Sequence, residues 1–278
     1  MITVGSPPVT IVQPSRGWWV LPLSEVWRFR DLFLLLVRRD VALRYKQTLL
    51  GLIWVVLQPL MASTIFAVVF GRLAQMPSDG VPYLPFVFAA LVPWTLFSQG
   101  VQRAGVSLVG DANLIGKVYF PRVLLPAASV GAVIVDVFVG LVTLAVIAVA
   151  TGVPLTAKLV VLPVALVLTL GLTLGVGFLV AALNVHYRDF VHAIPFVLQV
   201  GLYASPVVYS SRLVPERWRP IYGLNPLVGI VDLFRWLWLP TGAFPWPSVA
   251  SSALVSALLL LMSLLVFHRV ERRFADVI

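Results

Sequence analysis

Long apolar stretches are the feature of this sequence that most restricts how it can fold. A helix that crosses the roughly 30 Å hydrocarbon core of a membrane needs about 20 apolar residues, because each residue adds about 1.5 Å. The sequence offers six such helices, at residues 49–70, 84–100, 123–150, 159–185, 190–208 and 249–267. The fifth contains Pro195 and Pro206. We therefore predict an all-α, polytopic membrane protein with six transmembrane helices.

The composition agrees with a chain that lies mostly in lipid. Of its 278 residues 60% are hydrophobic and only 11% are charged, whereas soluble domains have about 25% charged residues. The absence of cysteine excludes disulfides, a thiolate nucleophile and cysteine metal sites. The three histidines, His186, His192 and His268, are scattered, and the first two lie on different faces of a helix. We predict that this chain binds no metal and no cofactor.

The segment before the first predicted span, residues 24–46, has a different pattern. Apolar residues recur there at steps of three and four, and Arg and Asp residues fill much of the rest. Such a helix cannot cross a membrane, because its charges would be stranded in lipid, but it can lie flat at the interface. Residues 1–23 have neither the basic start nor the apolar run of a cleaved signal peptide. We interpret them as an N-terminal tail.

The distribution of Lys and Arg predicts the orientation. With a cytoplasmic N-terminus, 14 of the 20 basic residues fall in cytoplasmic segments, as the positive-inside rule requires. The C-terminus is then also cytoplasmic. We predict a single domain over 1–278, made of the tail 1–23, the interfacial helix 24–46, a six-span bundle at 49–267 and a cytoplasmic tail at 268–278.

The external stretch after the fifth span holds an apolar run that is too short to cross. Residues 227–239 are apolar and aromatic but are interrupted by Asp232 and Arg235. Backbone that only half crosses a membrane is stable where protein or a water-filled cavity surrounds it. We predict short re-entrant helices that enter from the outer face.

Two features inside the spans predict helix packing. Asp136 lies in the middle of the third span, where an unpaired charge is costly, so we expect it to be paired inside the bundle. Gly171, Gly175 and Gly177 give the fourth span a face of small residues. This face allows close helix approach, either within one chain or between two chains.

The segment Gly110–Val118 resembles a phosphate-binding loop only superficially. Five residues separate Gly110 from Gly116 instead of four, and Val118 follows Lys117 where a Ser or Thr would bind magnesium. If ATP drives this protein, another chain must hydrolyse it. Residues 111–122 form instead a polar cytoplasmic connection, which is either a plain loop or a short helix that contacts a soluble partner.

Aromatic residues are abundant, with nine Trp, 16 Phe and seven Tyr. Many lie near the predicted span ends, where an interfacial aromatic belt explains them. The alternative is a surface that stacks on sugar rings. The candidates for glycan contact lie inside or at the ends of spans: Trp54, Phe66, Tyr203 and Tyr209.

Several motifs occur together in a characteristic order. They are Arg-Arg-Asp-Val-Ala-Leu-Arg-Tyr-Lys at 38–46, Leu-Gly-Leu-Ile-Trp at 50–54, Leu-Gln-Pro-Leu at 57–60, Asn-Leu-Ile-Gly-Lys-Val-Tyr-Phe-Pro-Arg at 113–122, Tyr-Arg-Asp at 187–189 and Leu-Asn-Pro at 224–226. In this order the chain, from about residue 25 to 273, resembles the type-2 ABC transporter permeases that export O-antigen, teichoic acid and related lipid-linked polysaccharides.

This resemblance implies a bacterial inner-membrane permease subunit rather than an enzyme. It implies a homodimer that pairs with two copies of a separate ATPase, which binds ATP and Mg²⁺, and a channel between the protomers for a lipid-linked polysaccharide. The implied coupling helix to the ATPase carries Asp111, Asn113, Lys117, Tyr119, Phe120 and Arg122. The implied external gate carries Asn225, Pro226, Asp232 and Arg235. From their charge, we expect four residues to contact the lipid headgroup at the interface: Arg38, Arg39, Arg44 and Lys46.

Three other functions are alternatives to export of a polysaccharide. An exporter of drugs or lipids with the same fold stays open as the alternative. A membrane-embedded enzyme would need clustered carboxylates, Ser/His pairs or metal ligands, and Asp189 and Asp232 stand far apart in the sequence. A channel or ion-coupled transporter would need a charged or carbonyl-lined filter, or broken helices in two repeats, and the sequence shows no such pattern.

Overall fold

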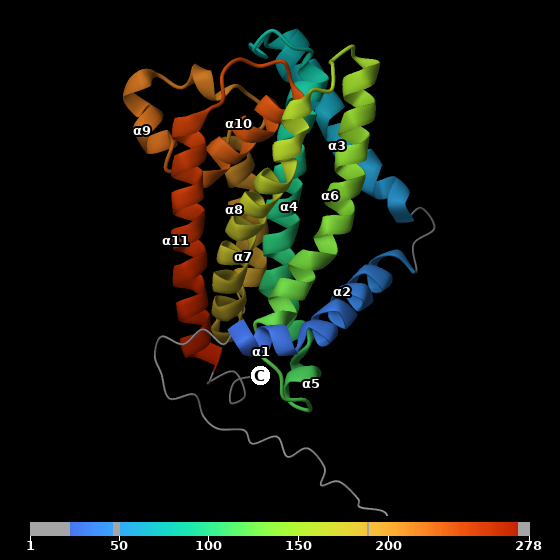
Figure 1. Ribbon diagram of the computed structural model, residues 1–278, viewed down its shortest axis with the longest axis vertical. Helices are drawn as coiled ribbons and strands as arrows, with labels where there is room; N and C mark the ends of the chain where they lie inside the picture. The colour runs from blue at the N-terminus through green and yellow to red at the C-terminus, as the bar shows by residue number, and fades with distance from the viewer. Residues whose placement is uncertain (1–22, 47–50, 188, 272–278) are drawn as a thin grey trace, which may run out of the picture.

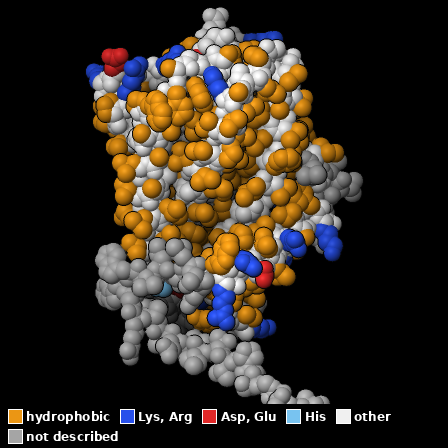
Figure 2. All heavy atoms as spheres, viewed as in Figure 1, with side chains coloured by type: hydrophobic (Ala, Val, Ile, Leu, Met, Phe, Trp, Pro, Cys, Tyr) orange, Lys and Arg blue, Asp and Glu red, His pale blue; other side chains and the backbone are white. Residues whose placement is uncertain are grey.

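The computed structural model describes residues 23–46, 51–187 and 189–271, and helices dominate these residues without any strand. Long helices run side by side along the vertical axis of Figure 1. Apolar side chains cover most of the face in Figure 2, and the charged side chains gather toward its two ends. This distribution matches a bundle that is surrounded by hydrocarbon between two polar layers. The prediction of an all-α membrane protein is confirmed.

Five helices of the described residues are long and apolar enough to cross a membrane. The first consists of α3 (Gly51–Phe66), which continues into the π-helical segment η1 (Ala67–Leu73). The second is α4 (Tyr83–Gly110) and the third is α6 (Leu124–Ala150). The fourth is α7 (Leu162–His186), which follows the 3-10 turn η2 (Ala157–Val161). The last is α11 (Trp246–Glu271). The predicted start of the first span, at residues 49 and 50, lies outside the described residues.

The fifth span, predicted at 190–208, is corrected at its end, because α8 (Phe190–Ala204) stops four residues earlier and is shorter than the other spans. It ends before Ser205, whose backbone is extended (φ −106°, ψ 153°), because Pro206 disfavours a helical conformation at the residue before it. The first turns of α8 pack near Gly105, since a methyl group there would lie 3.6 Å from Ile194. Beyond its end, the carbonyl of Val208 accepts a hydrogen bond from Tyr83. The chain therefore travels from one end of α4 to the other.

Two further predicted boundaries are corrected by the structure. The second span was expected to end at Gly100, but α4 continues to Gly110. Polar side chains of the added turns lower the hydropathy without breaking the helix, because they face a groove that is described below. The predicted tail 268–278 begins inside a helix, since α11 extends to Glu271.

The amphipathic segment forms two helices, α1 (Leu23–Arg28) and α2 (Arg30–Tyr45), with a break at Phe29. They lie across one end of the bundle (Figure 1). Leu36 of α2 is only 1% exposed and packs with Leu124, Leu125 and Ala128 of α6. The predicted helix at 24–46 is confirmed apart from this break. The preceding tail, up to residue 22, lies outside the described residues.

α4 is the most deeply buried of the long helices, because 78% of the residues in its apolar 18-residue stretch lie inside the protein. Small residues let its neighbours approach. A methyl group on Gly100 would lie 2.3 Å from Thr173 of α7, and one on Gly177 would lie 2.9 Å from Ala104. α7 also crosses α11 closely, because a methyl group on Gly175 would lie 2.9 Å from the backbone of Leu260. Gly175 and Gly177 therefore serve packing within the chain, whereas a methyl group on Gly171 would meet no atom within 4 Å.

Several short helical elements follow α8. They are η3 (Ser211–Leu213), η4 (Glu216–Trp218), α9 (Arg219–Tyr222) and α10 (Pro226–Trp238). α10 packs between α4 and α11 at the end of the bundle away from α2 (Figure 1). Ten of its 13 residues are buried, so protein surrounds this half-length helix. The predicted short helix at 227–239 is confirmed.

Candidate functional site

The only carboxylate in the middle of a described long helix is bound by the end of α2. Asp136 of α6 is 2% exposed, and both Arg44 and Tyr45 donate hydrogen bonds to its carboxylate. Arg44 also donates to Gln99 of α4 at 3.1 Å. Burial and the contact with Asp136 raise the pKa of Tyr45 to about 12, so its hydroxyl stays protonated and donates. The predicted internal pairing of Asp136 is confirmed, and its partners come from the amphipathic segment.

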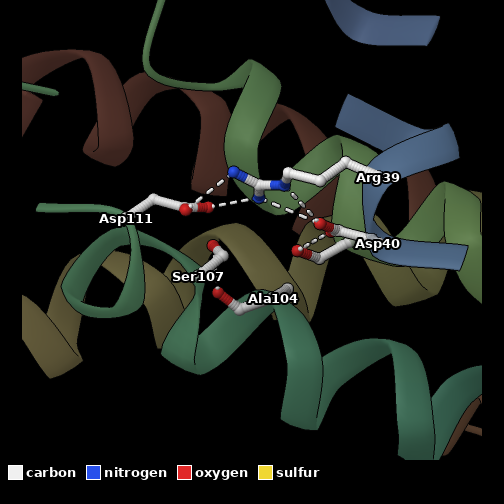
Figure 3. Close-up of polar contacts among 6 residues, drawn as sticks. Arg39, Asp40, Ala104, Ser107 and Asp111 are labelled. Atoms are coloured by element: carbon white, nitrogen blue, oxygen red, sulfur yellow. Dashed lines mark hydrogen bonds and ion pairs between the residues drawn. The ribbon is translucent and has the colours of Figure 1, made fainter. Parts of the chain in front are cut away.

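A second set of ion pairs joins α2 to the end of α4 (Figure 3). The guanidinium of Arg39 donates to both carboxylate oxygens of Asp111, at 2.9 and 2.7 Å. It also donates to Asp40 at 3.0 and 2.9 Å, and Asp40 accepts from Ser129 of α6 at 3.2 Å. The hydrogen bond to Asp111 is the main cause that raises the pKa of Arg39. A bidentate pair of this kind fixes orientation as well as distance.

Asp111 is also the first residue of the predicted coupling segment, 111–122. The segment contains one short helix, α5 (Ala112–Ile115), at the same end of the molecule as α2 (Figure 1). At its other end the backbone N–H of Arg122 donates to Glu271 of α11 at 2.8 Å, and the guanidinium donates to the Glu271 carbonyl. The segment is thus tied to α2 at its start and to α11 at its end.

The six predicted coupling residues fall into two groups. Asp111 and Arg122 make the contacts just described, and Phe120 is 4% exposed in the apolar cluster of α2, α6, α7 and α11. The other three point outward: Asn113, Lys117 and Tyr119 are exposed, Tyr119 by 65%. The inward group holds the segment in place, and the outward group is exposed at the surface.

The four predicted headgroup residues also divide into two groups. Arg38 and Lys46 are exposed, so their charges face the surroundings of the protein. Arg39 and Arg44 instead bind carboxylates of other helices. The Tyr187-Arg188-Asp189 motif follows α7, and Arg188 lies outside the described residues.

A polar stripe on α4 was missed by the sequence analysis. Polar residues recur along α4 at intervals of three and four, which places them on one face of the helix. They are Thr95, Ser98, Gln99, Gln102 and Arg103. The signal was this spacing within an otherwise apolar helix, but the second span was expected to end at Gly100. A polar stripe on a buried membrane helix needs protein or water beside it.

This stripe forms the floor of two adjoining cavities of about 550 and 270 Å³, which together we call the α4 groove. Both cavities are lined by Arg44, Gln58 and Gln99. Residues of α3 form one wall, and residues of α8 contribute to the other. The larger cavity is lined further by Gln102, Arg103, Gly105, Val106, Asn184, Val191, Ile194 and Pro195.

Of the four predicted glycan contacts, Phe66 lines the smaller cavity of the groove. Trp54 on α3 and Tyr203 on α8 are 46% and 53% exposed and are not among the residues that line it. The hydroxyl of Tyr209 lies 3.0 Å from that of Tyr222 and donates to the carbonyl of Tyr203 at 3.2 Å. Tyr209 therefore holds the loop after α8.

The predicted gate residues hold the short elements after α8 together. Arg235 is 4% exposed, lies 3.6 Å from the ring centre of Phe86 on α4, and donates to the carbonyls of Val207 at 2.9 Å and Tyr209 at 3.0 Å. Asp232 accepts from Ser211 at 2.9 Å.

The start of α10 is also fixed. The side chain of Asn225 accepts from the backbone N–H of Leu227 at 3.0 Å and so caps α10, and Pro226 occupies the first turn. Asn225 also donates to Ser205 at 3.0 Å. Together with the contacts of Arg235, they tie α10 to the loop after α8 and to the beginning of α4.

The family model for ABC-2 type transporters matches residues 31–239, which is 209 of the 278 residues. This chain belongs to the ABC-2 type transporter family. The match begins in α2 and ends directly after α10. Helix α2, the α4 groove and the short elements after α8 are therefore parts of the family domain of this permease, which is a multi-pass membrane protein.

Similar proteins align with this ABC-2 permease along most of its length. The O-antigen export system permease protein RfbA of Myxococcus xanthus is 28% identical over 256 residues, which cover 91% of this chain and 98% of the relative. The protein of the same name from Klebsiella pneumoniae is 26% identical over 254 residues, 89% of this chain and 95% of the relative. A second Klebsiella pneumoniae relative of that name is 24% identical over the same shares.

Proposed function

We propose that this chain is the membrane-spanning subunit of an ATP-driven exporter that moves a lipid-linked polysaccharide from the cytoplasm across the bacterial inner membrane. The observation that carries the proposal is the full-length similarity to relatives named as O-antigen export permeases. The α4 groove supports it against export of drugs. Pockets for drug-like molecules are mostly apolar, whereas the floor of the groove carries hydroxyl, carboxamide and guanidinium groups.

The channel in this proposal lies between two copies of the chain. A polysaccharide is too long to be enclosed in an occluded cavity, so it needs a continuous path. The groove lies between α3 and α8, and large apolar side chains of both helices, such as Ile65 and Phe196, are not covered by the rest of the chain. Two protomers that face each other along these helices would join their grooves into one passage.

The energy in this proposal comes from two copies of a separate ATPase, which bind ATP and Mg²⁺. Their contact is the exposed part of the segment 111–122, with Asn113, Lys117 and Tyr119. Closure of the ATPase dimer pushes this segment. The Arg39–Asp111 pair passes the motion to α2, and the contacts of α2 with Asp136 pass it to α6.

The test is a deletion of the gene in the source bacterium. We expect the polysaccharide to disappear from the cell surface and its lipid-linked form to accumulate inside, with recovery when the wild-type gene is returned. A deletion of the partner ATPase gene serves as the matched control and should give the same result. Normal surface polysaccharide after deletion of the permease gene would show that this chain exports something else.

A further inference from the structure

We propose that the larger cavity of the α4 groove is a binding site for a lipid-borne phosphate ester, with Arg103 as its main anion ligand. This inference deepens the proposed function, on which it rests for the identity of the transported molecule. Arg103, Gln99 and Gln102 on α4 form the polar side of the site. Gln58 of α3 and Asn184 of α7 add two further carboxamides.

The charge in this cavity is positive. Its lining contains two guanidinium groups, Arg44 and Arg103, and no carboxylate. Asp136 lines only the adjoining cavity, where Arg44 binds it. Within residues 23–46, 51–187 and 189–271, Arg103 has no carboxylate within 4.0 Å. The Arg103 guanidinium is repelled by that of Arg44 and attracted by the carboxylates of Asp136 and Asp40.

Hydrogen-bonding groups of the cavity are available to a ligand. In the part of the chain that the structure describes, the side chains of Arg103, Gln58 and Gln102 donate no hydrogen bond to protein atoms. Asn184 is 1% exposed and donates to the carbonyl of Gly105 at 2.8 Å, but its Oδ1 has no partner among the described residues. A buried acceptor without a partner is uncommon and needs an explanation. A hydroxyl beside the phosphate would supply its missing donor.

The chemistry of these groups selects phosphate. A guanidinium presents parallel N–H donors that match two phosphate oxygens, and primary carboxamides can donate to a third. The site lies in the half of α4 nearest to α2 and the segment 111–122. The wall formed by α8 is apolar, with Val191, Ile194 and Pro195, and Val106 of α4 adds another apolar side chain to the lining. A polar floor beside an apolar wall fits the phosphate of an amphiphile better than free phosphate, because the acyl or prenyl chain can cover the apolar side chains.

Two lipid classes carry this chemistry: a prenyl diphosphate that bears a sugar, and an anionic phospholipid. The experiment uses the full-length permease, purified into nanodiscs of phosphatidylcholine. Binding of farnesyl diphosphate, of dioleoyl phosphatidylglycerol and of the neutral alcohol farnesol is measured by tryptophan fluorescence, since Trp94 lies on the same groove. The variants are Arg103→Gln, Arg103→Lys and Gln102→Ala. The matched control is Arg72→Gln, an exposed arginine at the end of η1.

We expect Arg103→Gln to weaken binding of the phosphate-bearing probes by about tenfold to 100-fold, the usual range for a lost hydrogen bond to a charged group. Arg103→Lys should retain part of the affinity, Gln102→Ala should lose several-fold, and Arg72→Gln should bind as wild type. Tighter binding of farnesyl diphosphate assigns the site to the prenyl-linked substrate. Tighter binding of phosphatidylglycerol assigns the same phosphate site to a membrane phospholipid.

Equal binding of farnesol and farnesyl diphosphate, or unchanged phosphate affinity in Arg103→Gln, would overturn the proposal. Fluorescence-detected gel filtration of each variant confirms that it is folded. These outcomes are separate from the proposed function. If the deletion strain still exports its polysaccharide while the purified chain binds phosphate through Arg103, the function fails and the site stands. If export depends on the chain while Arg103→Gln binds as wild type, the site fails and the function stands.

Discussion

Charged residues inside this bundle are held by residues that are distant in the sequence. Asp136 is bound by Arg44 and Tyr45, which precede it by about 90 residues. Arg235 is bound by backbone carbonyls of the loop after α8. Each pair offsets the desolvation of a charge that could not stay in hydrocarbon alone. Asp136 and Arg235, although charged, therefore hold neighbouring elements of the bundle together.

The Asp136 contact predicts an asymmetric response to mutation. Asp136→Ala leaves the guanidinium of Arg44 without its carboxylate, and breaking a buried pair from one side costs about 3–5 kcal/mol. We expect the lower end of this range, because the Arg44 side chain is 23% exposed. The double variant Arg44→Gln/Asp136→Ala should be more stable than Asp136→Ala alone. The measurement is denaturant unfolding of the purified protein in detergent.

The control for this prediction is Asp31→Asn on the same amphipathic segment. The Asp31 side chain is 91% exposed, so the change should stay within about 0.5 kcal/mol of wild type. An Asp136→Ala protein as stable as Asp31→Asn would mean that the contact with Arg44 contributes nothing to the fold.

At the scale of helices, hydropathy predicted the spans because it averages over some 20 residues, so single polar residues change it little. The same averaging hid the end of α4, where Gln99, Gln102 and Arg103 lowered the signal although the helix continues to Gly110. The α4 groove needs side chains of α2, α3, α4, α7 and α8 together. No local pattern contains that information, because it arises only from tertiary packing.

The glycines of α7 give a matched pair of substitutions on one helix. Gly175→Ala pushes a methyl group against the backbone of α11 at Leu260, which cannot yield as a flexible side chain would. We expect a loss of about 1–3 kcal/mol in unfolding free energy. Gly171→Ala meets no atom within 4 Å and should gain up to about 1 kcal/mol from helix propensity. Detergent unfolding of both variants measures the difference, and equal stabilities would refute close packing of α7 on α11.

The Arg39–Asp111 pair links two elements, so it is tested by a double-mutant cycle. Arg39→Gln and Asp111→Asn each remove the bidentate contact, and each should lower ATP-driven export several-fold while the chain still inserts and assembles. The double variant should resemble the singles, because the same link is already broken in each of them. Arg30→Gln is the control, since Arg30 lies on the same helix and its side chain is 60% exposed. Additive losses in the double variant would show that the two residues act separately.

In the whole molecule, different elements with proposed roles gather at the two ends of the bundle. The segment 111–122, α2 and the polar half of the groove lie at one end of α4. Helix α10 and the loop that follows α8 lie at the other end of α4. There Tyr83 donates to the Val208 carbonyl, and the Phe86 carbonyl accepts from Arg235. This arrangement agrees with the proposed exporter, in which the ATPase and the substrate bind at one side of the membrane and exit is controlled at the other. It depends on α8 crossing completely, although its 15 residues span only about 23 Å.

That crossing and the orientation of the chain can be measured together. The protein has no cysteine, so single cysteines can be placed at Lys117, Leu155 and Arg217, all of which are exposed outside the long helices. With the N-terminus in the cytoplasm, a membrane-impermeant maleimide applied to spheroplasts should label Leu155→Cys and Arg217→Cys at once, and Lys117→Cys only after permeabilisation. The reverse pattern would invert the orientation. A third outcome is labelling of Arg217→Cys from the same side as Lys117→Cys, with Leu155→Cys on the opposite side. That result would mean that α8 turns back before it crosses. The two ends of the groove would then not face opposite sides of the membrane.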